Sequence, residues 1–137
     1  MIVRSTPALA LSVALLGCGG EDITADKTDS GVDDGTRLVV GVGGKCLDAN
    51  GTTPTDGALT ILWSCHGGSN QRWRLDPVTS EIRGYSGKCL DVAGAGGEGA
   101  SVILYGCHGG ANQKWTHDPA TGQSKGLGGL CLDVEGG

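Results

Sequence analysis

Three kinds of chemically useful side chain occur together twice in this chain: a carboxylate, an aromatic ring and two neighbouring amides. An ionised carboxylate accepts strong, charge-assisted hydrogen bonds, and an amide offers both a donor and an acceptor. An aromatic ring presents a flat apolar face. These residues therefore predict a binding site for a ligand with polar edges and an apolar face. The first set is Asp48, Trp63, Asn70 and Gln71, and the second set is Asp91, Tyr105, Asn112 and Gln113.

The two sets occupy matching positions of an internal repeat. The sequence Gly-Lys-Cys-Leu-Asp occurs around Cys46 and again around Cys89, and Cys-Leu-Asp-Val begins a third copy at Cys131. The spacing is 43 residues between the first two cysteines and 42 between the second and the third. A period of this length indicates one supersecondary unit that buries its apolar face against its neighbours. We expect each complete repeat to carry the function once.

Composition predicts an all-β domain in residues 37–137. The chain has 27 glycines and no phenylalanine, and no segment after residue 36 shows a sustained helical period. Short runs of aliphatic and aromatic residues, such as 59–63 and 101–105, are separated by glycine-rich turns. Many short strands at regular spacing give this pattern. About 100 residues are enough for one small domain.

The N-terminus resembles a bacterial lipoprotein signal peptide. Arg4 provides a positive charge, and residues 8–16 form an apolar stretch interrupted by Ser12. Nine residues are too short to span about 30 Å of hydrocarbon as a helix. The sequence Leu-Leu-Gly-Cys at residues 15–18 resembles a lipobox, which implies cleavage after residue 17 and lipidation of Cys18. An ordinary secretory signal is the alternative.

Residues 18–36 are predicted to be the lipidated cysteine followed by a disordered acidic linker. Residues 19–36 contain six acids, one base and few large apolar residues, so they cannot bury enough surface to fold. Residues 37–137 contain eight bases and nine acids, a net charge of −1. A nearly neutral domain lacks the basic surface that nucleic acid requires. We therefore expect no nucleic-acid partner.

The cysteines predict two disulfides, one in each complete repeat. Cys46 and Cys65 are 19 residues apart, and Cys89 and Cys107 are 18 apart. Each disulfide would stabilise the fold by about 3 kcal/mol in the chain-entropy model. Cys131 has no matching partner downstream. Zinc is the alternative, but the sequence lacks the Cys-x₂₋₄-Cys spacing of structural sites. We expect no metal.

Two motifs link the repeats to a known family. Gln71-x-Trp73 and Gln113-x-Trp115, each preceded by Cys-Leu-Asp at a fixed distance, resemble the Q-x-W signature of ricin B-type lectin domains. The resemblance covers residues 37–137. It implies a β-trefoil, in which three four-stranded repeats surround a pseudo-threefold axis. The repeats would be 37–78, 79–120 and an incomplete third, 121–137.

The resemblance also assigns roles to the recurring side chains. In this family the aspartate after the cysteine binds sugar hydroxyls, and the aromatic residue two positions before the second cysteine packs on the C–H face of the sugar ring. The asparagine before Q-x-W completes the contact. Ile61 and Ile103 occupy positions where many family members have a glutamine. The implied carbohydrate-binding residues are Asp48, Trp63, Asn70, Gln71, Asp91, Tyr105, Asn112 and Gln113.

Several of these residues have structural alternatives. Trp73 and Trp115 are expected in the core, where only the indole N–H needs a partner. The glutamines could bond to the backbone instead of a ligand, the aspartates could form turns, and Trp63 and Tyr105 could be packing residues. His66 and His108 lie in glycine-rich turns and are expected to be solvated.

The remaining motifs do not indicate catalysis. Residues 94–99 match Gly-x-Gly-x-x-Gly, but a strand-like segment follows where a dinucleotide site requires a helix. The two aspartates lie in different repeats, so they do not form a glycosidase pair. No Ser-His-Asp or Cys-His arrangement recurs. We therefore expect a non-enzymatic protein without cofactors.

We interpret the chain as an exported carbohydrate-binding module, with galactose-type glycans as its partners. The lipid on Cys18 would anchor it to the outer membrane or cell surface, and secretion is the alternative. The incomplete third repeat predicts an uncovered strand edge, an unpaired Cys131 and self-association. Two other functions remain open: a structural or protein-binding trefoil with decayed sugar sites, and an accessory subunit of a secreted hydrolase.

Overall fold

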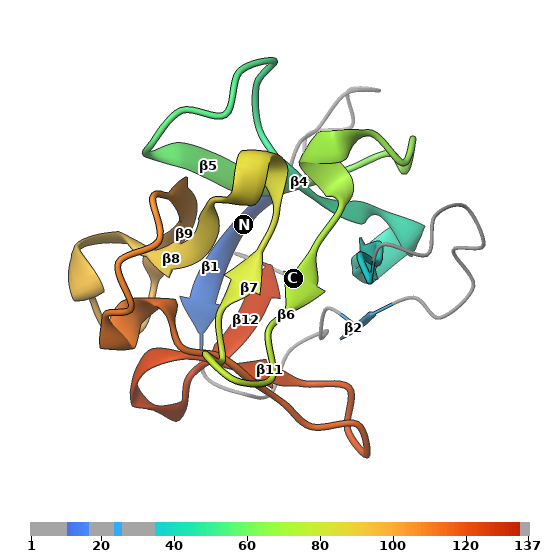
Figure 1. The fold of residues 1–137 in the computed structure, drawn as a ribbon. Coiled ribbons are helices and arrows are strands. Elements are labelled where there is room, and N and C mark those ends of the chain that lie inside the picture. Colours follow the sequence, from blue (N-terminus) through green and yellow to red (C-terminus); the bar gives the residue numbers. More distant parts are fainter. Residues whose placement is uncertain (1–10, 17–23, 26–34, 135–137) are drawn as a thin grey trace.

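The computed structural model describes residues 11–16, 24–25 and 35–134 (Figure 1). These residues form strands and short 3-10 turns, which confirms the prediction of an all-β domain. The strands are β1 (Leu11–Leu16), β2 (Thr24–Ala25), β3 (Val39–Val40), β4 (Cys46–Ala49), β5 (Ala58–Trp63), β6 (Arg74–Leu75), β7 (Ile82–Arg83), β8 (Cys89–Val92), β9 (Ala100–Tyr105), β10 (Thr116–His117), β11 (Ser124–Lys125) and β12 (Cys131–Val134). The 3-10 turns are η1 (Val42–Gly44), η2 (Ser69–Gln71), η3 (Tyr85–Gly87), η4 (Ala93–Ala95), η5 (Ala111–Gln113) and η6 (Leu127–Gly129).

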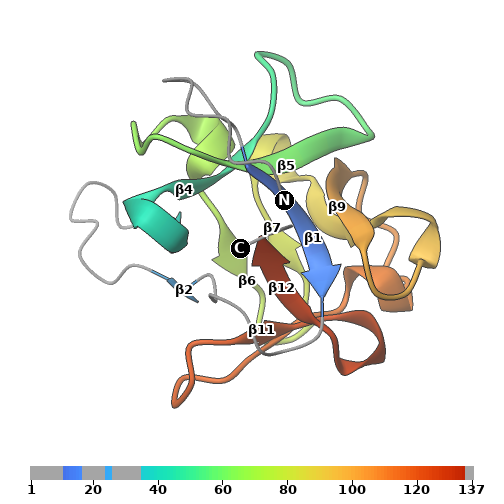
Figure 2. The same cartoon turned by 180° about the vertical axis from the view of Figure 1, so that it is seen from behind.

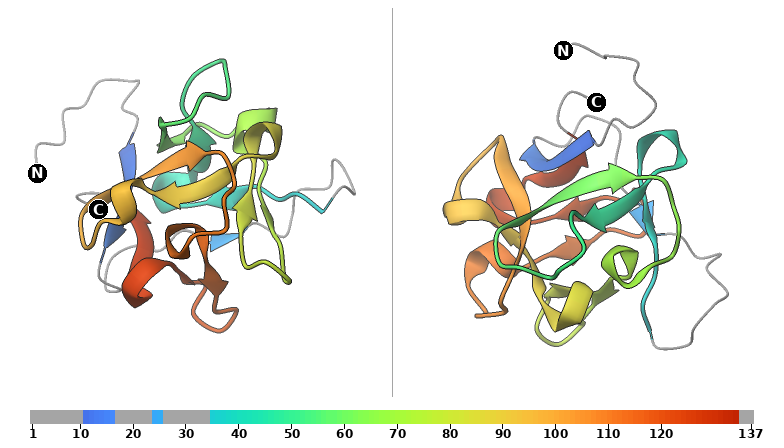
Figure 3. Two further views of the ribbon diagram at one scale, coloured as in Figure 1. Left: turned by 60° about the vertical axis from the view of Figure 1, so that its left-hand side comes forward. Right: turned by 90° about the horizontal axis from the view of Figure 1, so that it is seen from above.

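Three antiparallel strand pairs form a closed barrel: β4 with β5, β8 with β9, and β12 with β1. One strand of each pair also contacts the next pair, since β5 pairs with β9, β9 with β1, and β1 with β5. The views from behind and from above show these strands around a common centre (Figures 2 and 3). Closure leaves each of these three strands with neighbours on both sides. This threefold arrangement is the architecture of a β-trefoil.

The core forms where the repeated leucines and tryptophans meet. The Leu of each Cys-Leu-Asp motif is buried, and so are Trp73 and Trp115. The Trp73 indole N–H donates to the Leu47 carbonyl at 3.0 Å, and Trp115 donates equivalently to Leu90. The prediction that these tryptophans belong to the core is confirmed. Gly84 lies against the Trp73 ring so closely that a Cβ atom there would overlap it.

The third repeat differs from the expectation of an uncovered strand edge. Strand β12 pairs along its whole length with β1, from Cys131 opposite Leu16 to Val134 opposite Val13. Val13 is buried in the core. Cys131 is disulfide-bonded, so the prediction that it lacks a partner is also wrong. The expectation of an uncovered edge failed because a distant N-terminal strand pairs with β12, a contact that sequence order does not reveal.

The two predicted disulfides are present, and both join the second strand of a repeat to the turn after its third strand. Cys46 is bonded to Cys65 and Cys89 to Cys107, each with 5.1 Å between Cα atoms. The loop of about 20 residues that each one closes contains a strand pair that the ladder already aligns. The disulfides therefore fix the turns that follow β5 and β9.

Most of the predicted N-terminal segments lie outside the described residues. These include residues 1–10 and 17–23, and with them Cys18 and its predicted lipid. The predicted leader does contain β1, and the predicted linker contains β2, which pairs with β3. Among the described residues, no helix has the length and apolar character needed to cross a membrane.

Candidate functional site

The first cluster is built around the carboxylate of Asp48. Strand β4 is buried on both faces, so this side chain is only 4% exposed although it is charged. The Asn70 amide donates to Asp48 Oδ1 at 2.8 Å, and the Gln71 amide donates to Oδ2 at 2.8 Å. A buried charge requires such partners, because desolvation without hydrogen bonds is costly. The structure therefore brings together the three polar residues that the sequence predicted.

Gln71 serves the fold as well as the cluster. Its Oε1 accepts the backbone N–H groups of His66 at 2.8 Å and Gly67 at 3.1 Å. Its Nε2 donates to Ser64 O as well as to Asp48. Both amide hydrogens and both lone pairs are thereby used, and the side chain is fully buried. Gln71 thus holds Asp48 and the following turn in place and has no polar capacity left for a ligand.

The second cluster repeats this arrangement bond for bond. Asp91 accepts from the Asn112 amide at 2.9 Å and from the Gln113 amide at 2.8 Å. Gln113 accepts the backbone N–H of His108 at 2.8 Å, and it donates to Gly106 O at 3.0 Å. The same short turn, η2 in one repeat and η5 in the other, carries both amides. Nearly equal local sequences have produced the same hydrogen-bonded cluster.

Two histidines that sequence reasoning placed in solvent belong to these clusters. His66 Nε2 lies 3.4 Å from Asp48 Oδ2, and His108 Nε2 lies 3.3 Å from Asp91 Oδ2. Nδ1 of His66 accepts the N–H of Gly68, so the neutral ring carries its hydrogen on Nε2 and can donate it to the carboxylate. The imidazoles remain about half exposed. The signal in the sequence was their fixed position, three residues after each aromatic.

The aromatic residues border the clusters from the ends of β5 and β9. Trp63 is half-buried, whereas Tyr105 is 42% exposed. The Tyr105 ring meets the His108 ring edge to face, with 6.2 Å between centroids. Both aromatics retain exposed surface, as a stacking platform requires. Ile61 and Ile103 lie directly opposite the aspartates in the strand register and give no polar contact.

The third repeat does not reproduce the cluster within the described residues. Asp133 is buried like its counterparts, but Oδ1 accepts the backbone N–H of Val134 at 2.7 Å. No described asparagine or glutamine amide donates to it in the way that Asn70 and Gln71 serve Asp48. Two complete clusters are therefore present in the described part of the chain.

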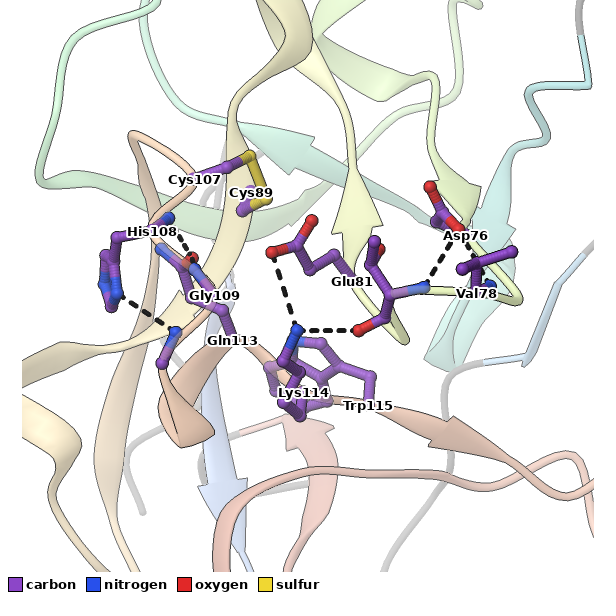
Figure 4. A network of polar contacts seen from close by, with 12 residues as sticks. Asp76, Val78, Glu81, Cys89, Cys107, His108, Gly109, Gln113, Lys114 and Trp115 are labelled. Atoms are coloured by element: carbon purple, nitrogen blue, oxygen red, sulfur yellow. Dashed lines mark hydrogen bonds and ion pairs between the residues drawn. A yellow bond between two sulfur atoms is a disulfide. The ribbon is translucent and has the colours of Figure 1, made fainter.

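The buried carboxylate of Glu81 forms an ion pair with the partly exposed Lys114, which supports the turn of the second cluster (Figure 4). Glu81 is bonded to Arg83 at 2.6 Å and lies 3.7 Å from Lys114, which also donates to Thr79 O. The Arg83 guanidinium holds the pKa of Glu81 below its ordinary value. Lys114 occupies the middle position of Gln113-x-Trp115, so the pair connects this turn to the start of its repeat.

This region does not provide a set of metal ligands. Glu81 lies within 4.8 Å of the sulfur atoms of Cys89 and Cys107. These two sulfurs are bonded to each other, as the yellow bond in Figure 4 shows, so neither is a thiolate. Metal binding by cysteine requires the deprotonated thiol.

The fold and the paired clusters define a β-trefoil domain with one polar site in each complete repeat. The model of the ricin-type β-trefoil lectin domain matches residues 35–137, and the chain belongs to this family. The expected family and fold are thereby confirmed. Family membership supports carbohydrate binding as the class of function.

Individual relatives cover different parts of the chain. The designed threefold-symmetric protein ThreeFoil is 32% identical with a TM-score of 0.63, and the match covers 82% of this chain and 84% of ThreeFoil. "Probable lipoprotein EnvE" of Salmonella typhimurium is 49% identical over 49 residues, which are 35% of this chain and 27% of EnvE. Nigrin b of Sambucus nigra is 41% identical over 59 residues, which are 43% of this chain and 10% of nigrin b. The chain thus spans a small part of both natural relatives.

Proposed function

We propose that the chain is a non-catalytic lectin with two sugar sites, one at Asp48 and one at Asp91. The observation that carries this proposal is the same oriented carboxylate in both repeats. Asparagine and glutamine amides hold both aspartates at 2.8 to 2.9 Å, beside an aromatic residue with exposed surface. A fixed carboxylate needs no reorganisation before it accepts a sugar hydroxyl, and preorganisation favours affinity.

Each group has a distinct role in this proposal. The aspartate accepts a hydrogen bond from a sugar hydroxyl, which is strengthened by its charge. Trp63 and Tyr105 pack on the C–H face of the ring, and Asn70 and Asn112 complete the polar contact. Gln71 and Gln113, predicted as binding residues, act by orienting the aspartates. No step transfers a proton or breaks a bond.

We propose galactose-type sugars as the ligands and expect weak binding that does not require a metal. A monosaccharide has about 12 heavy atoms, and roughly 0.3 kcal/mol per atom gives a binding free energy near −4 kcal/mol. This corresponds to a Kd of about 1 mM. Two sites on one chain raise the avidity for a polysaccharide without any additional contact.

Titration of the full chain with lactose and galactan, with and without EDTA, tests this proposal. The expected result is millimolar binding of lactose, unchanged by EDTA, and tighter binding of galactan. Asn70→Ala combined with Asn112→Ala should abolish binding, whereas Asn50→Ala changes an exposed asparagine outside both clusters and serves as the control. Loss of binding with EDTA would refute the metal-free mechanism. Failure to bind any glycan on an array would favour a structural or protein-binding trefoil.

We also propose that the protein is exported and anchored through a lipid on Cys18. Disulfides persist mainly in oxidising compartments, and EnvE is named a probable lipoprotein. Radiolabelled palmitate should enter the wild-type chain in a bacterial host but not Cys18→Ser. Equal labelling of both chains, or a wild-type protein found in the medium, would favour secretion without an anchor.

A further inference from the structure

The long loop between β4 and β5 of the first repeat contacts the second repeat at two points. The Tyr85 hydroxyl of η3 donates to Thr52 O at 2.9 Å. At the other end of the loop, Gly57 N donates to Leu104 O at 2.8 Å, where β5 begins to pair with β9. The loop is therefore attached to the strand that ends with the aromatic platform of the second site.

Asp56, next to this second attachment, bonds to the residue that follows the platform. Its Oδ1 accepts the backbone N–H of Gly106 at 2.9 Å and the Lys88 ammonium at 2.6 Å. Gly106 directly follows Tyr105, and Lys88 directly precedes Cys89 of the disulfide. Asp56 thus connects both edges of the second site from a different repeat.

In the first repeat, the corresponding lysine and the residue after the aromatic are connected without a residue from another repeat. There, the equivalent Lys45 donates directly to the Ser64 hydroxyl at 3.1 Å, and Ser64 is the residue after Trp63. The second repeat has glycine in place of this serine, so its lysine has no hydroxyl to bond to. The carboxylate of Asp56 bridges the gap between Lys88 and the Gly106 backbone.

We propose that Asp56 is a positioning residue of the second sugar site, which is consequently built from two repeats whereas the first is not. The proposal rests on the proposed sugar binding. Asp56 itself touches no sugar. Its hydrogen bond to Gly106 N–H fixes the backbone after Tyr105 and so keeps the ring beside His108. The ion pair with Lys88 keeps this carboxylate ionised, and its pKa is lowered by the same contact.

Three variants of the full chain separate positioning from general stability. Asp56→Ala removes both bonds, Asp56→Asn retains an oxygen that can accept the Gly106 N–H, and Glu98→Ala removes the acid at the equivalent, exposed position of the second repeat. Two-dimensional NMR of the free protein measures exchange of the Gly106 amide. Titration with lactose then follows the Trp63 indole for the first site and the Tyr105 amide for the second.

We expect Asp56→Ala to accelerate Gly106 amide exchange about tenfold by local opening. It should weaken lactose binding at the second site about fivefold, as expected for loss of one hydrogen bond, and leave the first site unchanged. Asp56→Asn should restore most of both properties, and Glu98→Ala should match the wild type. Equal weakening at both sites in Asp56→Ala, or no rescue by asparagine, would overturn the positioning role.

The free-protein measurement keeps this inference separate from the proposed function. If the wild type binds no lactose at either site, the proposed ligand is wrong, but Gly106 exchange and the Tyr105 ring shifts still report whether Asp56 positions the platform. If Asp56→Ala shows the same Gly106 exchange rate and Tyr105 ring shifts as the wild type, the inference is refuted even if lactose binds normally.

Discussion

Asp48 and Asp91, which we propose as ligand contacts, also serve the fold. Removal of an exposed carboxylate changes stability little, but these two carboxylates are not exposed. Both side chains are buried, and both accept hydrogen bonds from two amides. A site residue of this kind cannot be removed without leaving its amide partners unsatisfied.

Asp91→Ala should therefore abolish binding at the second site and also lower stability. Loss of the carboxylate leaves one buried N–H of Gln113 without an acceptor. An unsatisfied buried donor costs about 1–3 kcal/mol. Urea unfolding of the variant measures this loss. Glu98→Ala, which changes an exposed acid outside the clusters, is the control. A wild-type unfolding midpoint for Asp91→Ala would show that the second cluster is solvated and relaxed in solution.

At the scale of elements, the short turns η2 and η5 place the amide side chains of each cluster. Each turn requires a glycine at the position before it. Gly110 lies under the His108 ring and the Asn112 amide, so an added Cβ would come within 2.9 Å of both. The corresponding contacts surround Gly68 in the first repeat. Both glycines thus allow a histidine and an asparagine to face the same carboxylate.

Gly110→Ala should disturb the second site more than the fold. The new methyl group must displace His108 or Asn112, both of which face Asp91, because a Cβ does not occur at such short distances. We expect lactose binding to be lost at the second site and retained at the first. Gly97→Ala, at an open position of the preceding loop, is the control. Wild-type affinity at the second site would contradict the placement of these side chains.

The ion pair between Glu81 and Arg83 should make the element around β7 sensitive to acid. Arg83 lowers the pKa of Glu81 from 4.5, so the carboxylate is a stronger acid in the folded protein. Its stabilising contribution is complete above pH 4.5 and is lost as the pH falls through the lower folded-state pKa.

Glu81→Gln should accordingly reduce stability at pH 7 and flatten its decline below pH 4.5. Unfolding midpoints between pH 3 and pH 7 measure this, with Glu98→Gln as an exposed control. If the stability of Glu81→Gln falls below pH 4.5 as steeply as that of the wild type, other carboxylates cause the acid sensitivity. Asp56, Asp76 and Asp118 also have lowered pKa values, so part of the decline should remain.

At the scale of the whole molecule, residues 11–16 have two roles that exclude each other: a predicted signal peptide that is removed, and a strand of the barrel. Residues 11–16 belong to the predicted leader, and in the structure they form β1 between β12, β5 and β9. Cleavage before Cys18 would remove β1, take Val13 out of the core and leave β12 without its partner. The predicted processing would therefore open the barrel.

A chain that lacks residues 1–17 should melt at a lower temperature than the full chain and should self-associate. The unpaired edge of β12 exposes backbone donors and acceptors that can pair with a second copy. Size-exclusion chromatography and thermal melts measure both effects, and a chain lacking only residues 1–10 retains β1 as the control. A monomer with an unchanged melting temperature would show that barrel closure does not depend on β1.

The sequence by itself determined the features that each repeat encodes locally. Composition and short apolar runs predicted the all-β fold. The repeated spacing of Cys, Asp and Q-x-W predicted both disulfides and the burial of Trp73 and Trp115, because these patterns reflect strand pairing and core packing within about 40 residues. The same pattern identified Asp48, Asn70 and their counterparts as one cluster. Identical segments needed only their own short-range contacts to adopt identical shapes.

Only the tertiary structure decided the features that depend on contacts between repeats. Burial of Asp91 follows from packing on both faces of β8. Asp56 reaches Gly106 across 50 positions of the sequence, and β1 reaches β12 across more than 100. Periodicity carries no information about such pairs, because closing a barrel brings together residues that no repeat contains.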